Sequence, residues 1–139
     1  MLCALTAVAE SKGMIYGIYK AGDQTWFIDE GAAAEAAAKG AGYDFTYVDA
    51  KMSPEEYLRA IDNAIANNAA GVVTCIPDQT MSQAAVDKLA EAGIPVVGAG
   101  SVEVLLQIID GQEVTMETAV DAVVVTPETY VEVMGKDAE

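Results

Sequence analysis

The stretch SPEEYLRAIDNAIANNAAGVVTCI, residues 53–76, decides the fold. Its first part, 53–69, predicts a helix, because Ser53 stands at the N-cap before a proline and Glu56 follows three residues later, as in a capping box. The apolar residues of this part keep helical spacing. The second part, 71–76, is short and apolar, as expected of a buried strand. Apolar strands that alternate with such helices are typical of α/β folds with a parallel sheet.

The same alternation of strand and helix patterns continues along the rest of the chain. We expect strands over 14–19, 43–50, 71–76, 94–100 and 117–127, and helices over 27–42, 53–69, 80–93, 101–110 and 127–135. This pattern predicts a five-stranded, mainly parallel sheet with helices on both faces: a flavodoxin-like or Rossmann-like three-layer sandwich with strand order 2-1-3-4-5. No linker or low-complexity stretch divides the 139 residues, so we expect one domain over 14–139.

Residues 1–13 stand apart from this pattern. The segment MLCALTAVAES is apolar and contains Ala-Val-Ala before a polar switch at Glu10, which resembles the end of a secretory signal with cleavage after Ala9. The alternative is a short extra helix packed on the domain. No segment reaches the roughly 20 apolar residues of a membrane span, so we expect no membrane insertion.

Charge and composition exclude several classes of function. The chain has 22 acidic and 7 basic residues, a net charge of -15, which argues against nucleic acid and against anionic membrane surfaces. It has no histidine, and so it lacks the usual general base and the commonest metal ligand. Its two cysteines, Cys3 and Cys75, form no metal-binding spacing. We therefore expect neither a metal nor a cofactor.

Ligands of such sheets bind at the carboxyl ends of the strands. Four loops lie at that edge: 20–26, 49–53, 75–80 and 99–101. The first of them has only one glycine, so it is not a dinucleotide fingerprint, and Asp23 would face a phosphate. Asp78 lies beyond its strand without the acidic pair of a phospho-acceptor site.

Catalysis is disfavoured as well. Cys75 has no histidine to activate it and is better explained as a small buried residue at a strand end. Asp49, Glu55 and Glu56 are better explained as solvated or capping residues than as an acid/base pair. We expect a protein that is not an enzyme.

Binding is the remaining function for this edge. Trp26 is the only tryptophan, and its flat indole could stack on the apolar face of a sugar ring. Lys20, Asp23 and Gln24 could satisfy the hydroxyls around the ring. The alternative is that Trp26 anchors the first helix in the core, and composition alone does not choose between the two.

Three stretches carry a resemblance to a known family. They are GIYKAGDQTWF (17–27), PEEYLRAIDNAIANNAAGVVTCIPDQTMSQAAVDKLAEAGIPVVG (54–98) and VDAVVVTPETYVEVM (120–134). In this order they resemble the N-terminal lobe of type I periplasmic sugar-binding proteins, the class of the arabinose, ribose and galactose receptors. The resemblance implies a lobe that closes with a second lobe on a sugar and delivers it to an ABC transporter. We expect the second lobe to be missing, because 94–100 runs straight into a segment that resembles the helix returning from it.

The resemblance also implies roles for individual residues. Lys20 matches a sugar-contacting lysine, Trp26 a stacking tryptophan, and Cys75 a cysteine at the edge of the sugar pocket. Asp23 and Gln24 stand where an acidic pair lies in the family. The ligand-binding residues that we expect are Lys20, Asp23, Gln24, Trp26, Cys75, Asp78 and Ser101.

One departure from the family lies after the fourth strand. The family offers one or two aspartates there, which hold ring hydroxyls, whereas this chain has Gly100 and Ser101. The strongest sugar-holding group of the lobe is therefore absent, and we expect weak binding by the lobe alone.

The sequence thus predicts a non-catalytic lobe of an ABC-transporter substrate-binding protein, exported to the periplasm or beyond. Its expected partners are a pentose or hexose, an ABC transporter permease, and a second copy paired through the open cleft. One alternative is an interaction module that uses the former sugar cleft to meet itself or another protein. Another is the effector-binding part of a lactose-repressor-type regulator, although the expected DNA-binding motif is absent from the N-terminus.

Overall fold

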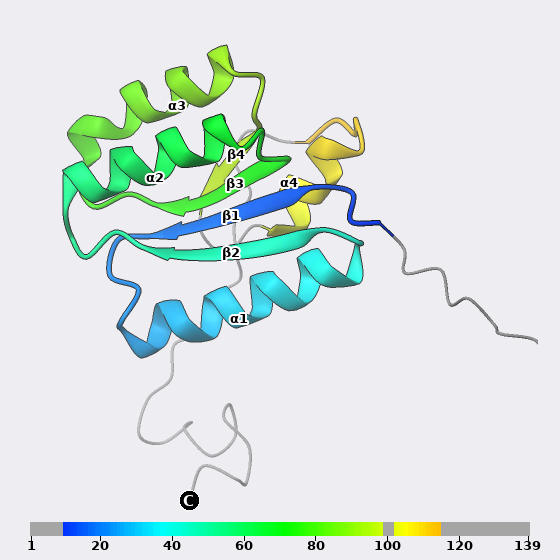
Figure 1. Ribbon diagram of the computed structural model, residues 1–139, viewed down its shortest axis with the longest axis horizontal. Coiled ribbons are helices and arrows are strands. Elements are labelled where there is room, and N and C mark those ends of the chain that lie inside the picture. The colour runs from blue at the N-terminus through cyan, green and yellow to red at the C-terminus, as the bar shows by residue number, and fades with distance from the viewer. Residues whose placement is uncertain (1–9, 99–101, 115–139) are drawn as a thin grey trace, which may run out of the picture.

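Four parallel strands form the sheet on which the rest of the fold is built (Figure 1). The computed structural model describes residues 10–98 and 102–114. The strand order is β2-β1-β3-β4. The elements are β1 (Met14–Tyr19), α1 (Thr25–Gly40), β2 (Asp44–Asp49), α2 (Pro54–Ala66), β3 (Gly71–Cys75), the 3₁₀ turn η1 (Gln79–Met81), α3 (Ser82–Glu91), β4 (Val96–Gly98) and α4 (Val102–Ile109).

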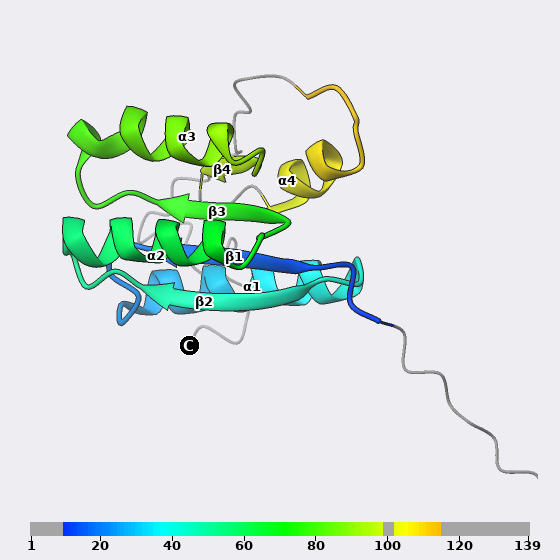
Figure 2. The same ribbon diagram turned by 45° about the horizontal axis from the view of Figure 1, so that its top comes forward.

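Helices cover both faces of the sheet, as Figures 1 and 2 show. On one face, α2 and α3 pack over a core that includes Tyr57, Ile61 and Leu89. On the other face, α1 and α4 pack over a core that includes Val73 and Leu105. Alternate side chains of each strand enter the two cores, as the period of two along a β-strand requires. The predicted α/β class, the parallel sheet and the order 2-1-3-4 are confirmed.

The remaining predictions for the C-terminal part concern residues that the structure does not describe. The fifth strand (117–127) and the last helix (127–135) lie outside the described residues. At the other end, residues 10–13 form no helix, and Lys12 N–H donates to the Gly42 carbonyl at 2.9 Å. Residues 1–9 also lie outside the described part, so the signal segment stays a prediction.

Two element boundaries differ from the prediction for identifiable reasons. The strand expected over 94–100 begins later, at Val96, because Ile94 N–H donates to the Leu89 carbonyl at 2.9 Å and so belongs to the end of α3. The helix expected from residue 27 begins at Thr25, because the Gln24 carbonyl accepts from Ile28 N–H at 3.1 Å. This earlier start places the tryptophan within the first turn of α1.

The predicted cap of α2 is half confirmed. Ser53 Oγ accepts from Glu56 N–H at 3.3 Å, as an N-cap does. The Glu56 carboxylate does not return to Ser53, because it accepts from Arg59 Nη1 at 2.8 Å instead. The Ser53 N–H donates to the Ala50 carbonyl at 2.8 Å. A cation one turn further along the helix has therefore replaced the second bond of the capping box.

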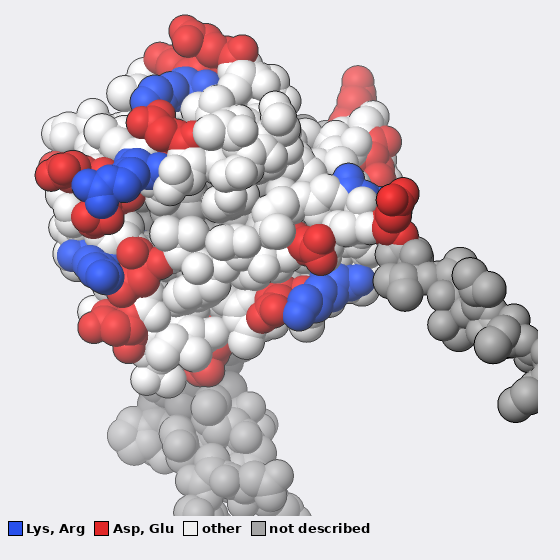
Figure 3. Space-filling view, viewed as in Figure 1, with Lys and Arg blue, Asp and Glu red and all other residues white. Residues whose placement is uncertain are grey.

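The surface is acidic, and basic side chains on the face in Figure 3 lie beside acidic ones. The ion pairs among the described residues are Lys39–Glu35, Arg59–Glu55, Arg59–Glu56 and Lys88–Asp62. These pairs are solvent-exposed and contribute little to stability. In the part that the structure describes, no helix is long and apolar enough to cross a membrane.

Candidate ligand site at the carboxyl ends of the strands

The carboxyl ends of β1, β2 and β3 meet at one edge of the sheet, on the left in Figure 1. Three described loops leave this edge: 20–24 toward α1, 50–53 toward α2, and 76–78 toward η1. The fourth loop, with Gly100 and Ser101, lies outside the described residues. The expected role of Ser101 therefore stays a prediction.

Trp26 lies on the outside of the first turn of α1, with 75% of its surface exposed. The neighbouring Phe27 is the residue that faces inward, and its ring centroid lies 5.7 Å from that of buried Tyr19. Successive residues of a helix differ by about 100° in direction, so only one of the two can enter the core. The alternative of Trp26 as a core anchor is therefore wrong.

Lys20, Asp23 and Gln24 are presented on the same loop. Asp23 and Gln24 are exposed and Lys20 is half-buried. The side chains of these three residues make no hydrogen bond or ion pair with the described part of the chain. Asp23 and Gln24 line an open pocket of about 270 Å³ between this loop and the loop after β2. Their polar groups are free to meet a ligand.

The loop is held in place by two residues of β2. Asp49 Oδ1 accepts from Gly22 N–H at 2.7 Å, and the Tyr47 hydroxyl donates to the Gly22 carbonyl at 2.9 Å. We call these three residues the Gly22 clamp. The expected capping role of Asp49 is seen in its bond from Lys51 N–H at 2.8 Å, but its carboxylate also bonds a loop 27 residues away, which the sequence did not predict. The local sequence pattern does not indicate that Asp49 bonds Gly22. Its position at the end of a strand, beside the loops that could bind a ligand, is the one sequence feature that could have drawn attention to it.

Cys75 ends β3 beside the first loop, where it pairs with Tyr19 in the sheet register. Its side chain is half-buried. Burial raises the pKa of the Cys75 thiol, and the nearby Lys20 charge lowers it in part. The protonated thiol is therefore the dominant form near neutral pH, which agrees with a packing role and not with a nucleophile.

Asp78 is engaged in local structure. Its Oδ1 accepts from Thr80 N–H at 2.9 Å and from the Thr80 hydroxyl at 2.8 Å, which caps η1. These two bonds lower the pKa of the Asp78 carboxyl. A ligand could reach Asp78, because it is exposed, but its first role is to shape the loop after β3.

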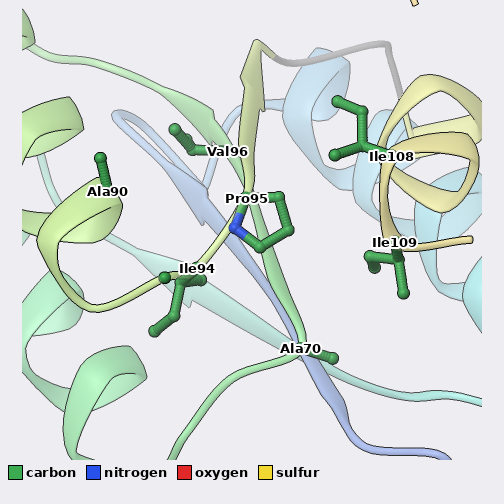
Figure 4. Close-up of a pocket in the computed structure, with 8 residues that line it drawn as sticks. Ala70, Ala90, Ile94, Pro95, Val96, Ile108 and Ile109 are labelled. Carbon is green, nitrogen blue, oxygen red and sulfur yellow. The ribbon is translucent and has the colours of Figure 1, made fainter. Parts of the chain in front are cut away.

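A larger hollow of about 590 Å³ lies at the opposite edge of the sheet, beside β4 (Figure 4). Ala70, Ile94, Pro95, Ile108 and Ile109 contribute apolar walls. No charged or hydroxyl-bearing side chain lines it, so it offers little to a sugar. The hollow lies near the start of β4, between the segment that leads into this strand and the end of α4.

The described residues hold no group of three or more His, Cys, Asp or Glu side chains that could bind a metal ion. The carboxyl edge instead combines one exposed aromatic face with a cation, a carboxylate and an amide on one loop. This combination suits an uncharged, hydroxyl-rich ring.

The chain belongs to the family described as the periplasmic binding protein domain, whose model matches residues 15–102. The match covers β1 to the start of α4 and so includes the carboxyl-edge loops. A search of curated proteins gives no match.

Solved structures of solute-binding proteins share the fold. An ABC transporter solute-binding protein from Bacillus halodurans C-125 with bound myo-inositol aligns at 18% identity and a TM-score of 0.57, over 66% of this chain and 32% of that one. One from Agrobacterium vitis, bound with alpha-D-tagatopyranose, aligns at 25% identity and a TM-score of 0.56, over 63% and 30%. A periplasmic ribose ABC transporter protein from Conexibacter woesei aligns at 25% identity and a TM-score of 0.56. The alignment covers 65% of this chain and 30% of that one. The matched part of the chain thus spans about 30% of the length of these proteins.

Proposed function

We propose that this lobe binds a pentose or hexose at the carboxyl edge of its sheet, as the substrate-binding part of a sugar ABC transporter. The observation that carries the proposal is the position of Trp26, whose indole is 75% exposed beside polar side chains without partners in the described chain. The indole is not part of the core, so its face is available to cover a ligand at this edge. The structural relative with bound tagatose, a hexose, supports the same ligand class.

The chemistry of the edge supports recognition of a neutral ring. The indole face can cover the C–H groups of one sugar face. The Lys20 ammonium can donate to ring hydroxyls, the Asp23 carboxylate can accept from them, and the Gln24 amide can do both. No step of bond making or breaking is part of this proposal, which describes a binding protein and not an enzyme. Export to the periplasm and docking on a permease belong to the same proposal, and membership of the family supports them.

The affinity of this edge alone is expected to be weak. The described residues contact a sugar from one side, and the hydroxyls on its other side stay in water. Each net hydrogen bond contributes about 0.5–1.5 kcal/mol, so three missing bonds reduce the affinity by roughly a hundredfold. We therefore expect dissociation constants well above those of a ligand enclosed on both sides.

The experiment is a titration with arabinose, galactose, ribose, xylose and glucose, followed by Trp26 fluorescence and by calorimetry. A saturable change with one sugar supports the proposal. Lys20→Met is expected to weaken that binding, whereas Lys12→Met, which removes an exposed lysine near the opposite edge, leaves it unchanged. No heat and no fluorescence change up to tens of millimolar sugar would reject the proposal.

A second candidate is an interaction module that uses the same edge for self-association. Trp26, Ile28 and Met52 expose 75%, 50% and 56% of their surfaces, so these apolar side chains are available for contact with a second copy. The net charge of -15 opposes the approach of two copies, so salt should favour pairing. Sedimentation at low and high salt tests this candidate, and a monomer under both conditions removes the homodimer.

A further inference from the structure

The Gly22 clamp controls the loop that carries the candidate ligand groups. Both backbone polar groups of Gly22 are occupied by side chains of one strand, Asp49 on the N–H and Tyr47 on the carbonyl. Tyr47 and Asp49 are two positions apart in β2, so their side chains leave the strand on the same face. The glycine is therefore held against β2 from two directions.

The same carboxylate also ties a second loop to the first. Asp49 Oδ1 accepts from Lys51 N–H at 2.8 Å in addition to the bond from Gly22. Lys51 and Met52 adopt left-handed backbone angles, with φ of 53° and 54°, which non-glycine residues rarely do. A charge-assisted bond at this position stabilises a backbone that is otherwise unfavourable. Asp49 Oδ1 thus bonds the loops after β1 and β2, which are also joined by a backbone bond from Met52 N–H to the Lys20 carbonyl.

The clamp closes only because residue 22 has no side chain. A Cβ at this position would lie 2.6 Å from Asp49 Cβ and 2.9 Å from Asp49 Cα. The second of these atoms is backbone and cannot rotate away. The close approach lets the short aspartate side chain reach the Gly22 N–H directly.

Tyr47 is kept in the form that can donate. Partial burial raises the pKa of the Tyr47 hydroxyl, and the negative charges of Asp49, Glu30 and Asp23 raise it further. The ring stacks on buried Tyr19 with centroids 4.9 Å apart, so its position is fixed by the core beneath the loop. The clamp therefore connects the core of the sheet to the exposed loop.

We propose that Asp49 and Tyr47 are positioning residues of the ligand site, which order the 20–24 loop before a ligand arrives. Lys20, Asp23 and Gln24 lie within two residues of Gly22, and Trp26 follows in the first turn of α1. A loop that is ordered in the free protein avoids the entropy loss of ordering it on binding. The proposal rests on the proposed sugar-binding function, and it adds residues that need not touch the sugar.

The test compares Asp49→Ala and Asp49→Asn with the control Asp44→Ala in the full chain. Asp44 is an exposed aspartate at the other end of β2, and its side chain makes no hydrogen bond within the described residues. The first measurement is ¹⁵N relaxation of residues 20–24 without sugar. The second is the dissociation constant for the sugar found above, with urea unfolding as a check that each variant is folded.

We expect Asp49→Ala to lower the order parameters of residues 20–24 from about 0.85 toward 0.6 while α2 stays rigid. Sugar binding should weaken about tenfold, a change of the size expected for a lost charge-assisted contact. Asp49→Asn should restore both readouts in large part, because the amide oxygen can accept the same two N–H groups. Asp44→Ala should change neither.

Two results would overturn the proposal. One is an Asp49→Ala protein that is less stable but keeps a rigid loop and full affinity, which would make Asp49 a structural residue only. The other is a loose loop with unchanged sugar affinity. If Asp49→Ala does not fold, Tyr47→Phe removes a single bond to the loop and should weaken binding about threefold.

Failure of the proposed function is distinguishable from failure of the clamp. If the wild-type chain binds no sugar, the sugar assignment falls and the role of the clamp in sugar binding falls with it. The relaxation measurement still decides whether Asp49 orders the loop, because it uses no ligand.

Discussion

The Thr74 hydroxyl of β3 lies 3.1 Å from the Tyr57 hydroxyl of α2, in the buried layer between the sheet and the helix. The same Thr74 oxygen donates to the Ile18 carbonyl of β1 at 3.0 Å. Thr74 is buried, and its two bonds join a helix to two strands. A buried hydroxyl needs such partners, because losing them leaves polar groups unsatisfied.

Thr74→Val is predicted to destabilise the protein by about 1–3 kcal/mol, because it leaves the Ile18 carbonyl and the Tyr57 hydroxyl without this partner. Urea unfolding followed by circular dichroism measures the change. Thr46→Val is the matched control, since Thr46 is half-buried in the edge strand β2 and its hydroxyl donates only to the weakly accepting Met14 sulfur, so stability should change by less than about 0.5 kcal/mol. Adding Tyr57→Phe to Thr74→Val should recover part of the loss. Strictly additive effects would contradict a direct bond.

Stability is predicted to fall as the pH rises above about 10, the ordinary pKa of tyrosine. Burial raises the pKa of Tyr19 and of Tyr57 in the folded protein. The unfolded chain therefore releases these phenolic protons first, and the stabilisation present below pH 10 is lost as the pH rises through the folded values. Urea titrations from pH 8 to 11 measure the slope, which Tyr19→Phe and Tyr57→Phe should each reduce. A slope unchanged in both variants would assign the effect to net charge instead.

Gly22→Ala is predicted to destabilise the protein by about 1–3 kcal/mol, because the new Cβ meets the backbone of Asp49. Gly40→Ala is the contrast. Gly40 ends α1 with no atom within 4 Å of an added Cβ, so alanine there should stabilise by about 0.4–1 kcal/mol. Thermal melts of both variants measure these changes. Equal melting temperatures would show that the loop after β1 can move to accommodate the added Cβ at little cost in stability.

Cys75 is predicted to react slowly with iodoacetamide at pH 7. Its reaction should become faster as the pH rises past the pKa of an ordinary thiol. The reason is the burial that raises its pKa. The rate is measured by mass spectrometry in a Cys3→Ser background, with free cysteine as the reference. A midpoint below pH 8 would show that the Lys20 charge outweighs burial.

The sequence was sufficient for the fold because its signals are local. The strand MIYGIY has the predicted bounds, and Ser53 caps α2 as predicted. Helical spacing within α2 and a run of apolar residues in β3 are enough to predict a helix and a buried strand. The order 2-1-3-4 then follows from parallel strands with short connections.

The candidate site was predicted only in part. The position of Lys20, Asp23 and Gln24 on one loop follows from their place after β1. The sequence did not show whether the Trp26 side chain points into the core or into solvent. The helix was expected from residue 27, and only its start at Thr25 places Trp26 on the helix, where neighbouring side chains differ by about 100° in direction. Phe27, the actual inward residue, differs from Trp26 by one position.

By itself, the sequence determined the α/β class, the edge where a ligand would bind, and the polar and aromatic groups on the first loop. These properties depend on residue type and spacing along short stretches. Only the tertiary structure decided that Trp26 faces solvent and that Asp49 and Tyr47 hold Gly22. The physical reason is that these contacts join residues 25 to 27 positions apart, at distances set by how β2 and α1 pack on β1. Hydrogen bonds of this range leave no period in the sequence, and they exist only once the strands are in register.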